Sequence, residues 1–383
     1  MKERIVFVTS DLYYVNAFLA RQIKLAAKNY HVTLIVNCDP LLAGAAISNC
    51  GDVLNFSINR RISLISDLRS LFRLIWFFML YRPAIVHSTT PKAGLLAMLA
   101  ARITGVKFRL HTFTGQVWQT RVGLLKRLLI LTDKITSSCS SFVLMDSHSQ
   151  RQLLLKQNIV SDARSGVIGQ GSICGVDSAR FVADARCRTE MRRELGIPKE
   201  AVVILYMARF TVDKGALLMA SAYAKLCAAE NHSIYLLMVG PDEEQLTEKI
   251  TDRLQGAKGK YALISYTDTP ERFFQCADIF CLPSFREGFP MVLLNAAACE
   301  VPVVASHIYG CSDAVVDGVT GSLFPPGDVD GLCAALVTMI AAPESRTRMG
   351  RAARERVEMC FSEERVNLHL MRLYEESTGC RQV

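Results

Sequence analysis

The 383-residue sequence predicts an α/β protein built from two doubly wound parallel sheets. Three observations predict this fold. Short apolar segments of strand length alternate with amphipathic segments of helix length along the whole chain. A glycine-rich stretch at 165–175 interrupts the alternation near its middle, and the length fits two ordinary domains. Two such sheets are expected to place a cleft between their facing carboxyl edges, where ligands of open α/β sheets bind.

In the first half, runs of aliphatic and β-branched residues bounded by polar ones predict the strands. These strands are Arg4–Thr9, His31–Val36, Ala84–His87, Val106–His111 and Ser141–Met145. Apolar residues spaced three and four apart predict the helices between them. We expect these helices at about Asn16–Lys28, Ser63–Leu80, Pro91–Ile103, Gly123–Ile135 and Ser147–Gln157.

The second half restarts the alternation. Its predicted strands are Val202–Met207, Ile234–Val239, Ala262–Ile264, Asp278–Leu282 and Val301–Ala305. The predicted helices are Gly215–Ala229, Glu243–Leu254, Glu271–Gln275, Met291–Cys299 and Val329–Ala341, followed by Glu344–Cys360 and Glu363–Ser377. The last helix is amphipathic, as expected if it packs back on the first domain. The expected domains are therefore 1–168, 169–360 and a C-terminal helix within 361–383.

The net charge of +8 is unevenly divided. Residues 1–165 carry 21 basic and 8 acidic side chains, a balance of +13, and residues 166–383 carry 23 and 28, a balance of −5. A uniformly basic nucleic-acid binder would not show this division, so nucleic acid is not an expected partner. Either the first half faces an anionic surface or acidic ligand, or the asymmetry has no function.

Apolar runs are too short for a membrane span or a signal peptide. The candidate Leu74–Tyr81 is an uninterrupted run of eight residues, against the roughly 18 to 20 that a span needs. The N-terminal apolar run reads as a first strand, so we expect a cytoplasmic protein. The 13 cysteines are scattered without a C-x-x-C pair, which favours reduced thiols used as small core residues.

Two turns of the second half carry candidate site residues. Arg209 and Lys214-Gly215 follow a predicted strand and open a helix, where two cations and the helix N-terminus can converge on a diphosphate. The alternative is two solvated cations. Glu287 follows another strand, at the carboxyl edge where ligands bind. Asn295, eight residues on, shares its side of the next helix if that helix starts near Pro290.

These residues resemble the nucleotide-sugar-binding domain of the family-4 retaining glycosyltransferases, which have the GT-B fold of two Rossmann-like domains. The resemblance covers essentially the entire chain. Its pieces are Arg209 with Lys214-Gly215, Val239-Gly240, Ala277–Ser284, Glu287-Gly288-Phe289, Val301–Ala305 and Asp317–Gly321. Together, in this order and on these elements, they are specific.

The resemblance implies roles for these residues. Arg209 and Lys214 hold the donor's diphosphate and offset the charge that grows on the leaving group, and Glu287 contacts donor-sugar hydroxyls. Gly240, Gly288, Phe289, Pro290 and Met291 complete the donor site. The donor is a UDP-sugar, configuration is retained, and neither cofactor nor metal is needed. One departure is Asn295, because the family has a second Glu there that binds the ribose.

The first domain resembles the subgroup that extends bacterial surface polysaccharides on undecaprenyl diphosphate-linked sugars. The resemblance places acceptor or phosphate contacts at Asn16, Lys92, Thr114 and Gly115. Lys92 follows Pro91 in a first helical turn, where it and nearby amides present positive charge. His111 ends a strand and is either a catalytic residue that orients a hydroxyl or phosphate, or a structural histidine. Related enzymes often have a His where this chain has Thr114.

Two predicted helices of the first domain mix basic and apolar residues. They carry Arg60, Arg61, Arg69, Arg73 and Arg82 with Leu71, Phe72, Ile75, Trp76, Phe78 and Met79, then Arg121, Lys126, Arg127 and Lys134 with Leu124, Leu125, Leu128, Leu129 and Ile130. Such helices meet an anionic membrane surface, each cation contributing about 1 kcal/mol, or are ordinary core helices with solvated backs. A polyprenyl acceptor favours peripheral association with the inner face of the cell membrane.

The prediction is a retaining glycosyltransferase that moves an N-acetylhexosamine or a deoxy derivative, such as GalNAc or FucNAc, to an undecaprenyl diphosphate-linked saccharide. A sugar-nucleotide epimerase of similar fold and an inactive donor-binding subunit are the alternatives. Asp328-Val329-Asp330 matches a metal-binding D-x-D, but its place before an apolar helix favours Asp328 as an N-cap.

Overall fold

The computed structural model describes residues 2–58, 63–229, 233–257 and 260–379, which form two compact units. Unit 1 is Met1–Gly175 with Glu364–Val383, and unit 2 is Val176–Glu363. The glycine-rich stretch belongs to unit 1 because the Ser172 N–H donates to the Asp146 carbonyl at 2.7 Å and Gln22 Nε2 donates to the Ile173 carbonyl at 2.6 Å. The division after Gly175 therefore falls later than the expected boundary at residue 168.

Unit 1 holds a parallel sheet, which in the described ranges has seven strands in the order β3-β2-β1-β4-β5-β6-β7. The strands are β1 (Arg4–Val8), β2 (His31–Val36), β3 (Asp52–Asn55), β4 (Ile85–Thr89), β5 (Phe108–Phe113), β6 (Phe142–Met145) and β7 (Ser165–Val167). The order reverses direction between β1 and β4, so the sheet is doubly wound as predicted.

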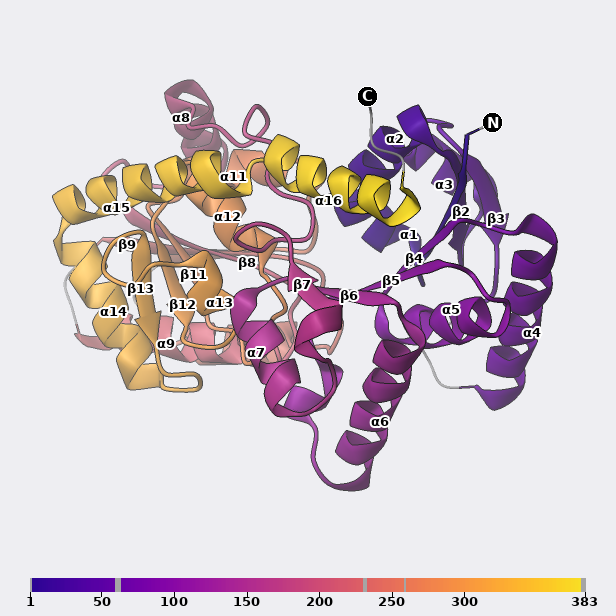
Figure 1. The fold of residues 1–383 in the computed structure, drawn as a ribbon. Coiled ribbons are helices and arrows are strands. Elements are labelled where there is room, and N and C mark those ends of the chain that lie inside the picture. The colour runs from indigo at the N-terminus through magenta and orange to yellow at the C-terminus, as the bar shows by residue number, and fades with distance from the viewer. Residues whose placement is uncertain (1, 59–62, 230–232, 258–259, 380–383) are drawn as a thin grey trace. The chain divides into compact units, whose positions relative to one another are not determined.

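Helices cover both faces of this sheet (Figure 1). They are α1 (Leu12–Tyr14), the π-helix η1 (Val15–Leu19), α2 (Ala20–Asn29), α3 (Pro40–Ala46), α4 (Leu64–Tyr81), α5 (Pro91–Ile103), η2 (Val117–Thr120), α6 (Gly123–Cys139), α7 (His148–Lys156), η3 (Asp162–Arg164) and α16 (Glu363–Thr378). Val6 and Val8 pack in the core beneath α4, α5 and α6. Phe7 points to the other face, where its ring lies 6.3 Å from that of Tyr374 on α16.

Unit 2 holds the second parallel sheet, ordered β10-β9-β8-β11-β12-β13 over the residues that are described. Its strands are β8 (Val202–Met207), β9 (Ile234–Val239), β10 (Lys260–Ile264), β11 (Ile279–Leu282), β12 (Val303–Ser306) and β13 (Gly321–Phe324). Its helices are α8 (Ala185–Glu194), α9 (Ala216–Ala229), α10 (Thr247–Leu254), α11 (Pro270–Cys276), α12 (Met291–Ala298), α13 (Cys311–Ala314), α14 (Val329–Ala341), α15 (Pro343–Arg356) and the π-helix η4 (Val357–Phe361).

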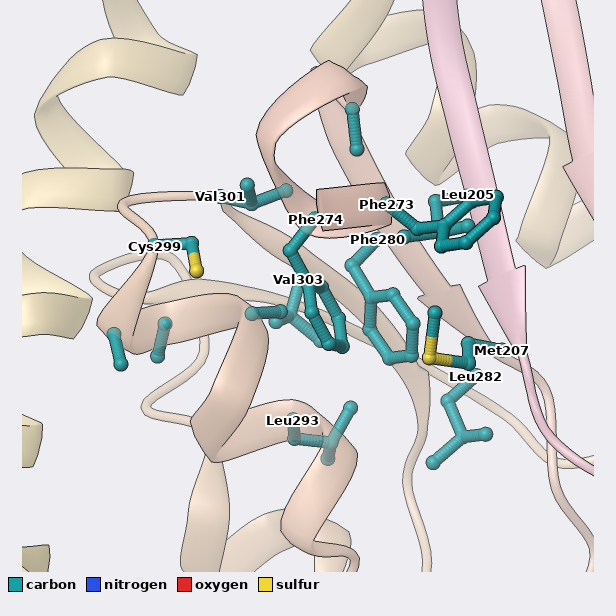
Figure 2. Packing of buried hydrophobic residues seen from close by; sticks show 14 of the residues in the cluster. Leu205, Met207, Phe273, Phe274, Phe280, Leu282, Leu293, Cys299, Val301 and Val303 are labelled. Carbon is teal, nitrogen blue, oxygen red and sulfur yellow. The ribbon is translucent and has the colours of Figure 1, made fainter. Parts of the chain in front are cut away.

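Strand alternation divides the core of unit 2 between two faces. Val203, Leu205 and Met207 of β8 pack with α8, α11 and α12, whereas Ile204 and Tyr206 pack with α9, α10 and α14. Figure 2 shows the first of these clusters, where side chains of β8 and β11 meet those of α11 and α12. Each large apolar side chain buried there contributes about 1.5–3 kcal/mol to stability.

The strands that the sequence pattern missed are β3, β7 and β13, and each lies at the edge of its sheet. They contain three or four residues, and β3 has no buried position, only two half-buried residues between two exposed ones. An edge strand pairs on one side only, so its apolar pattern is short and weak. The hydrophobic pattern therefore predicted most of the inner strands closely and missed three edge strands.

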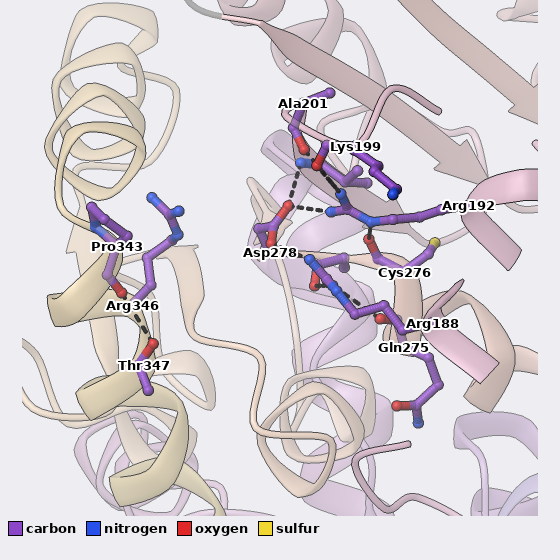
Figure 3. A network of polar contacts seen from close by, with 12 residues as sticks. Arg188, Arg192, Lys199, Ala201, Gln275, Cys276, Asp278, Pro343, Arg346 and Thr347 are labelled. Carbon is purple, nitrogen blue, oxygen red and sulfur yellow. Dashed lines mark hydrogen bonds and ion pairs between the residues drawn. The ribbon is translucent and has the colours of Figure 1, made fainter. Parts of the chain in front are cut away.

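Helix α8 was also missed because its sequence is strongly polar, and the structure shows what its charges do. Arg188 and Arg192 pair with the two oxygens of the Asp278 carboxylate at 2.6 and 2.5 Å (Figure 3). The Val203 N–H donates to the same carboxylate at 2.7 Å. These contacts join α8 to the amino ends of β8 and β11, which fixes the two strands that carry the candidate site.

Candidate active site

Two loops of unit 2 bring the predicted donor-binding residues together. One follows β8 and leads into α9, and the other follows β11 and leads into α12. β8 and β11 are neighbours in the sheet, yet α9 packs on one face and α12 on the other. This position is the topological switch point, where open α/β sheets hold ligands beyond the carboxyl ends of their strands.

The two loops are fastened to each other by backbone and side-chain contacts. The Phe285 N–H donates to the Asp213 carbonyl at 2.8 Å, and the Arg286 guanidinium pairs with the Asp213 carboxylate at 3.2 Å. Gly215 has a φ of +71°, and a Cβ there would lie 2.0 Å from the Pro283 carbonyl oxygen. Glycine alone combines this backbone conformation with this close approach. The loops therefore form one rigid rim.

Lys214 and Glu287 form an ion pair across this rim. The Lys214 ammonium lies 2.7 Å from both carboxylate oxygens of Glu287, and the two side chains are only 19% and 9% exposed. Partial burial strengthens their attraction and makes either charge costly when left alone. The sequence analysis placed both residues in the site with separate roles, and the structure shows that they are partners.

Arg209 is paired with an acidic residue that the sequence analysis missed. Its guanidinium binds the Glu243 carboxylate, and the neighbouring Glu244 accepts from the Val212 N–H at 2.9 Å. Both partners in the Arg209–Glu243 pair are more than a third exposed, so an incoming anion can displace Glu243 at small electrostatic cost. The sequence position of Glu243 and Glu244 could have marked them as site residues, because they follow the predicted strand that ends at Val239.

Buried hydroxyls lie at the same edge of the sheet. Thr211, Ser284 and Ser306 follow or end β8, β11 and β12, and within the described chain their hydroxyls have no hydrogen-bond partner. A buried polar group without a partner costs about 1–3 kcal/mol. Hydroxyls without partners at a switch point indicate that a polar ligand or ordered water forms their hydrogen bonds.

The remaining predicted donor residues surround the rim. Gly240 directly follows β9, and a Cβ there would lie 1.9 Å from the Ala208 carbonyl oxygen. Gly288, Phe289 and Pro290 are buried in the β11–α12 loop. The Phe289 ring lies 5.4 Å from that of Phe361, so this side chain is part of the core.

Helix α12 begins at Met291 with Pro290 as its N-cap, as the sequence analysis assumed. Asn295 is therefore little more than one turn into the helix, half-buried on its side. An amide at this position can both accept and donate a hydrogen bond, although it carries no charge.

Two predicted residues of unit 1 have structural partners. The His111 imidazole is 1% exposed, its Nδ1 lies 2.8 Å from the Ser88 hydroxyl, and burial lowers its pKa to about 3. A buried neutral ring with a hydroxyl partner fits the structural alternative for His111, and its catalytic role stays a prediction. The Lys92 ammonium pairs with Asp67 of α4 at 2.8 Å, with both side chains mostly buried. A phosphate would have to displace Asp67 from Lys92, and the phosphate contact expected from the sequence stays a prediction.

The other acceptor candidates lie in segments that follow strands of unit 1. Asn16 is exposed in η1, in the segment after β1. Thr114 and Gly115 come directly after β5, with Thr114 half-buried. All three remain candidates for acceptor contacts.

The D-x-D motif has a structural explanation. The Asp328 carboxylate caps α14 by accepting from the Asp330 and Gly331 N–H groups at 3.0 and 2.9 Å. Asp330 pairs with Lys225. Across the described ranges, no cluster of three or more His, Cys, Asp or Glu side chains has the arrangement of a metal site.

An apolar face of unit 1 is exposed rather than packed. On α4, every fourth residue from Leu64 to Leu80 is exposed, and so is Met79. Apolar residues of α6, and Val122 just before it, are exposed as well. These residues are Leu64, Leu68, Phe72, Trp76, Met79, Leu80, Val122, Leu124, Leu125, Leu128 and Leu131. Phe78 is in the core, whereas Trp76 is 64% and Leu124 82% exposed. The alternative of ordinary core helices therefore does not account for these exposed side chains. Two of the predicted cations, Arg60 and Arg61, lie outside the described residues.

Among the helices that are described, none is long and apolar enough to cross a membrane.

Comparison with known sequences identifies the family of this chain. The family "Glycosyl transferases group 1" matches residues 188–356, and "Glycosyl transferase 4-like domain" matches residues 19–171. The capsular polysaccharide biosynthesis glycosyltransferase CapM of Staphylococcus aureus is 30% identical over 318 residues, which are 83% of each chain. The chain is a group 1 glycosyltransferase. A second relative of this glycosyltransferase, 26% identical over 73% of its chain and 72% of the other, is the Escherichia coli UDP-Gal:alpha-D-GlcNAc-diphosphoundecaprenol alpha-1,3-galactosyltransferase.

Solved structures show that the glycosyltransferase has the GT-B fold. Sucrose-phosphate synthase of Thermosynechococcus elongatus superposes with a TM-score of 0.81 at 20% identity, covering 99% of this chain and 100% of the other. Anabaena HepE in complex with UDP and glucose also gives 0.81, at 15% identity over 98% and 100% of the two chains. The expected fold of two Rossmann-like domains is confirmed.

Proposed function

We propose that this glycosyltransferase moves a sugar from a UDP-sugar to an undecaprenyl diphosphate-linked saccharide with retention of configuration and without a metal. The Lys214–Glu287 pair at the switch point of unit 2 carries the proposal. A cation and a carboxylate held together at that edge match a donor that presents a diphosphate beside sugar hydroxyls.

Lys214 and Arg209 bind the diphosphate, whose negative charge grows as the bond from the anomeric carbon to the phosphate oxygen breaks. Glu287, released from part of its contact with Lys214, accepts hydrogen bonds from sugar hydroxyls. The acceptor hydroxyl attacks the same face of the anomeric carbon and passes its proton to the departing phosphate oxygen. The Arg209 and Lys214 cations stabilise the negative charge of the leaving diphosphate, which a metal ion would otherwise do, so the step needs no metal.

The acceptor class rests on relatives rather than on the geometry of unit 1. The E. coli relative is named for a sugar linked to diphosphoundecaprenol, and the S. aureus relative is named for capsule synthesis. We propose an N-acetylhexosamine or a deoxy derivative as the transferred sugar. The site in unit 2 leaves that sugar open, so a panel of donors decides it.

The activity is tested by mass spectrometry with a panel of UDP-sugars and of undecaprenyl diphosphate-linked saccharides, with and without EDTA. We expect one donor to give a product extended by one sugar, at a rate that EDTA does not change. Loss of activity in EDTA would contradict the metal-independent step. Conversion of a UDP-sugar without any acceptor would favour an epimerase, and binding without turnover would favour an inactive subunit.

The exposed apolar face of α4 and α6 is proposed to contact the anionic inner surface of the cell membrane. It lies in the unit with the charge surplus, and cations stand on the same helices, such as Arg69 on α4 and Arg127 on α6. An apolar face beside cations is the pattern of an interfacial helix.

We expect the protein to sediment with vesicles of phosphatidylglycerol and phosphatidylethanolamine at low salt and to dissociate as salt rises. Trp76→Ser combined with Leu124→Ser removes two exposed apolar side chains and should reduce the bound fraction severalfold without lowering thermal stability. Met359→Ser, at a position 61% exposed on unit 2, is the matched control and should bind like the wild type. Full recovery of the wild type in the supernatant at low salt would contradict membrane association.

A further inference from the structure

The hydroxyl of Tyr206 contacts the loop that carries both cations of the candidate donor site. Tyr206 is the last but one residue of β8 and is fully buried. Its hydroxyl donates in a three-centre hydrogen bond to the Arg209 carbonyl at 3.1 Å and to the Lys214 carbonyl at 3.2 Å. The side chains of these same two residues are the ones that the proposed function assigns to the diphosphate. One buried hydroxyl therefore holds the backbone of both.

The rest of the Tyr206 side chain is part of the hydrophobic core. Its ring packs in the cluster between the sheet and α9 and lies 6.1 Å from the Phe210 ring. A phenylalanine would fill the same space, so the hydroxyl adds polar contacts to the loop rather than packing. Burial raises the pKa of this hydroxyl well above its ordinary value, and the nearby Glu287 charge acts in the same direction. The hydroxyl therefore keeps its proton and stays a donor.

A different hydrogen bond holds the middle of this loop. The Asp213 carbonyl accepts from the Phe285 N–H at 2.8 Å, which ties the middle of the loop to the loop after β11. Tyr206 instead joins the beginning of the loop to its end. Because one hydroxyl reaches both carbonyls, the Arg209 and Lys214 backbones are kept at a fixed separation.

A fixed separation suits a ligand whose two negative groups are themselves at a fixed separation. The phosphates of a diphosphate are joined by one bridging oxygen, so two cations bind both of them only when the cations are suitably spaced. A loop that is already ordered loses no conformational entropy when the donor binds, which strengthens binding. The Tyr206 hydroxyl provides this order from inside the core.

We propose that Tyr206 is a positioning residue for donor binding, whose hydroxyl holds Arg209 and Lys214 at the separation that the diphosphate requires. Because Tyr206 is fully buried, it acts through the backbone of these two residues and not by touching the donor. The inference rests on the proposed function for the presence of a diphosphate in the donor. It assigns the preorganisation of that site to a residue of the core.

A matched pair of tyrosine variants tests the proposal. Tyr206→Phe removes the hydroxyl and keeps the ring. Tyr223→Phe is the control, because Tyr223 is also fully buried in unit 2 and its hydroxyl also reaches two carbonyls, those of Ile234 at 3.1 Å and Lys260 at 2.6 Å. These carbonyls lie at the amino ends of β9 and β10, at the edge of the sheet opposite the donor site. Each variant removes one donor from two carbonyls, so both should stay folded and lower the melting temperature by similar amounts.

The readout is the affinity for UDP relative to that for uridine, which has the same base and ribose but no phosphate. Isothermal titration calorimetry measures the Kd of UDP, and NMR titration measures the weaker Kd of uridine, both with the full chain. We expect Tyr206→Phe to raise the UDP Kd by about tenfold and to leave the uridine Kd unchanged, since only the phosphate contacts depend on the spacing of the cations. Tyr223→Phe should leave both constants unchanged. A wild-type UDP Kd in Tyr206→Phe, or a parallel rise in the Kd of UDP and of uridine, would overturn the proposal.

Amide hydrogen exchange tests the positioning without a ligand. We expect the peptide spanning 209–215 to exchange faster in Tyr206→Phe than in the wild type, and to exchange at the wild-type rate in Tyr223→Phe. Unchanged exchange of this peptide in Tyr206→Phe would also overturn the proposal. A wild-type chain that does not bind UDP would contradict the proposed donor, and with it the role of Tyr206. A wild-type chain that binds UDP but transfers no sugar would contradict only the proposed reaction.

Discussion

Glu287→Gln should lower the rate of sugar transfer by about 100-fold while the protein stays folded. The substitution keeps the shape of the side chain and removes the charge that both holds Lys214 and accepts from the donor sugar. Hydrogen bonds to charged groups contribute about 1.5–3 kcal/mol, which corresponds to roughly one to two orders of magnitude in rate. Transfer is measured with the donor and acceptor identified by the panel, alongside thermal unfolding.

Glu194→Gln is the matched control for this experiment. Glu194 also pairs with a cation of unit 2, Arg272, at 3.1 Å, but the Arg272 and Glu194 side chains are 40% and 50% exposed. Exposed pairs contribute about 0–1 kcal/mol, so this variant should keep wild-type transfer and stability. A Glu287→Gln enzyme that transfers sugar at a near-normal rate would remove Glu287 from the site.

Lys214→Met should raise the Kd for UDP by about 10- to 100-fold, since it removes a charge-assisted contact to the diphosphate. The variant also leaves the Glu287 carboxylate buried without its partner, which lowers stability by about 3–5 kcal/mol if the charge is retained. Isothermal titration calorimetry with UDP measures the affinity. Lys225→Met, which breaks the exposed pair with Asp330, should bind UDP normally.

The double variant Lys214→Met with Glu287→Gln separates binding from stability. Removing both charges leaves no uncompensated buried ion, so the double variant should recover much of the stability that Lys214→Met loses. Its affinity for UDP should stay low. Wild-type UDP affinity in the double variant would show that Lys214 does not bind the diphosphate.

How far the sequence predicted the site depends on the distance over which each feature acts. The turns after Met207 and after Leu282 were located correctly, because a buried strand, a polar turn and a helix start are all local signals. Asp328 as the cap of α14 is confirmed for the same reason. The pairing of Lys92 with Asp67 was not predicted, because Asp67 lies on another helix that the pattern around Lys92 does not reveal.

The end of β4 shows the same limit. The sequence analysis ended the predicted strand at His87, whereas β4 continues through Ser88 and Thr89 into the core. A threonine after an apolar run looks like the start of a solvated turn. Only the packing of α2 and of the segment at Ile173 over that edge makes Thr89 a buried group that faces a cavity.

The sequence by itself determined the class of fold, most of the helices and inner strands, and the two loops that carry the charged residues of the donor site. The spacing of apolar residues and the residue types in the turns determine these features, and both are set by a few neighbouring residues. The tertiary structure decided which charges meet. The order β10-β9-β8-β11-β12-β13 sets β8 beside β11, and this pairing brings Lys214 to Glu287 across 73 positions of the chain. The same assembly left hydroxyls without partners among the described residues at the switch point of unit 2, because strand order and helix packing, unlike periodicity, are long-range properties of the chain.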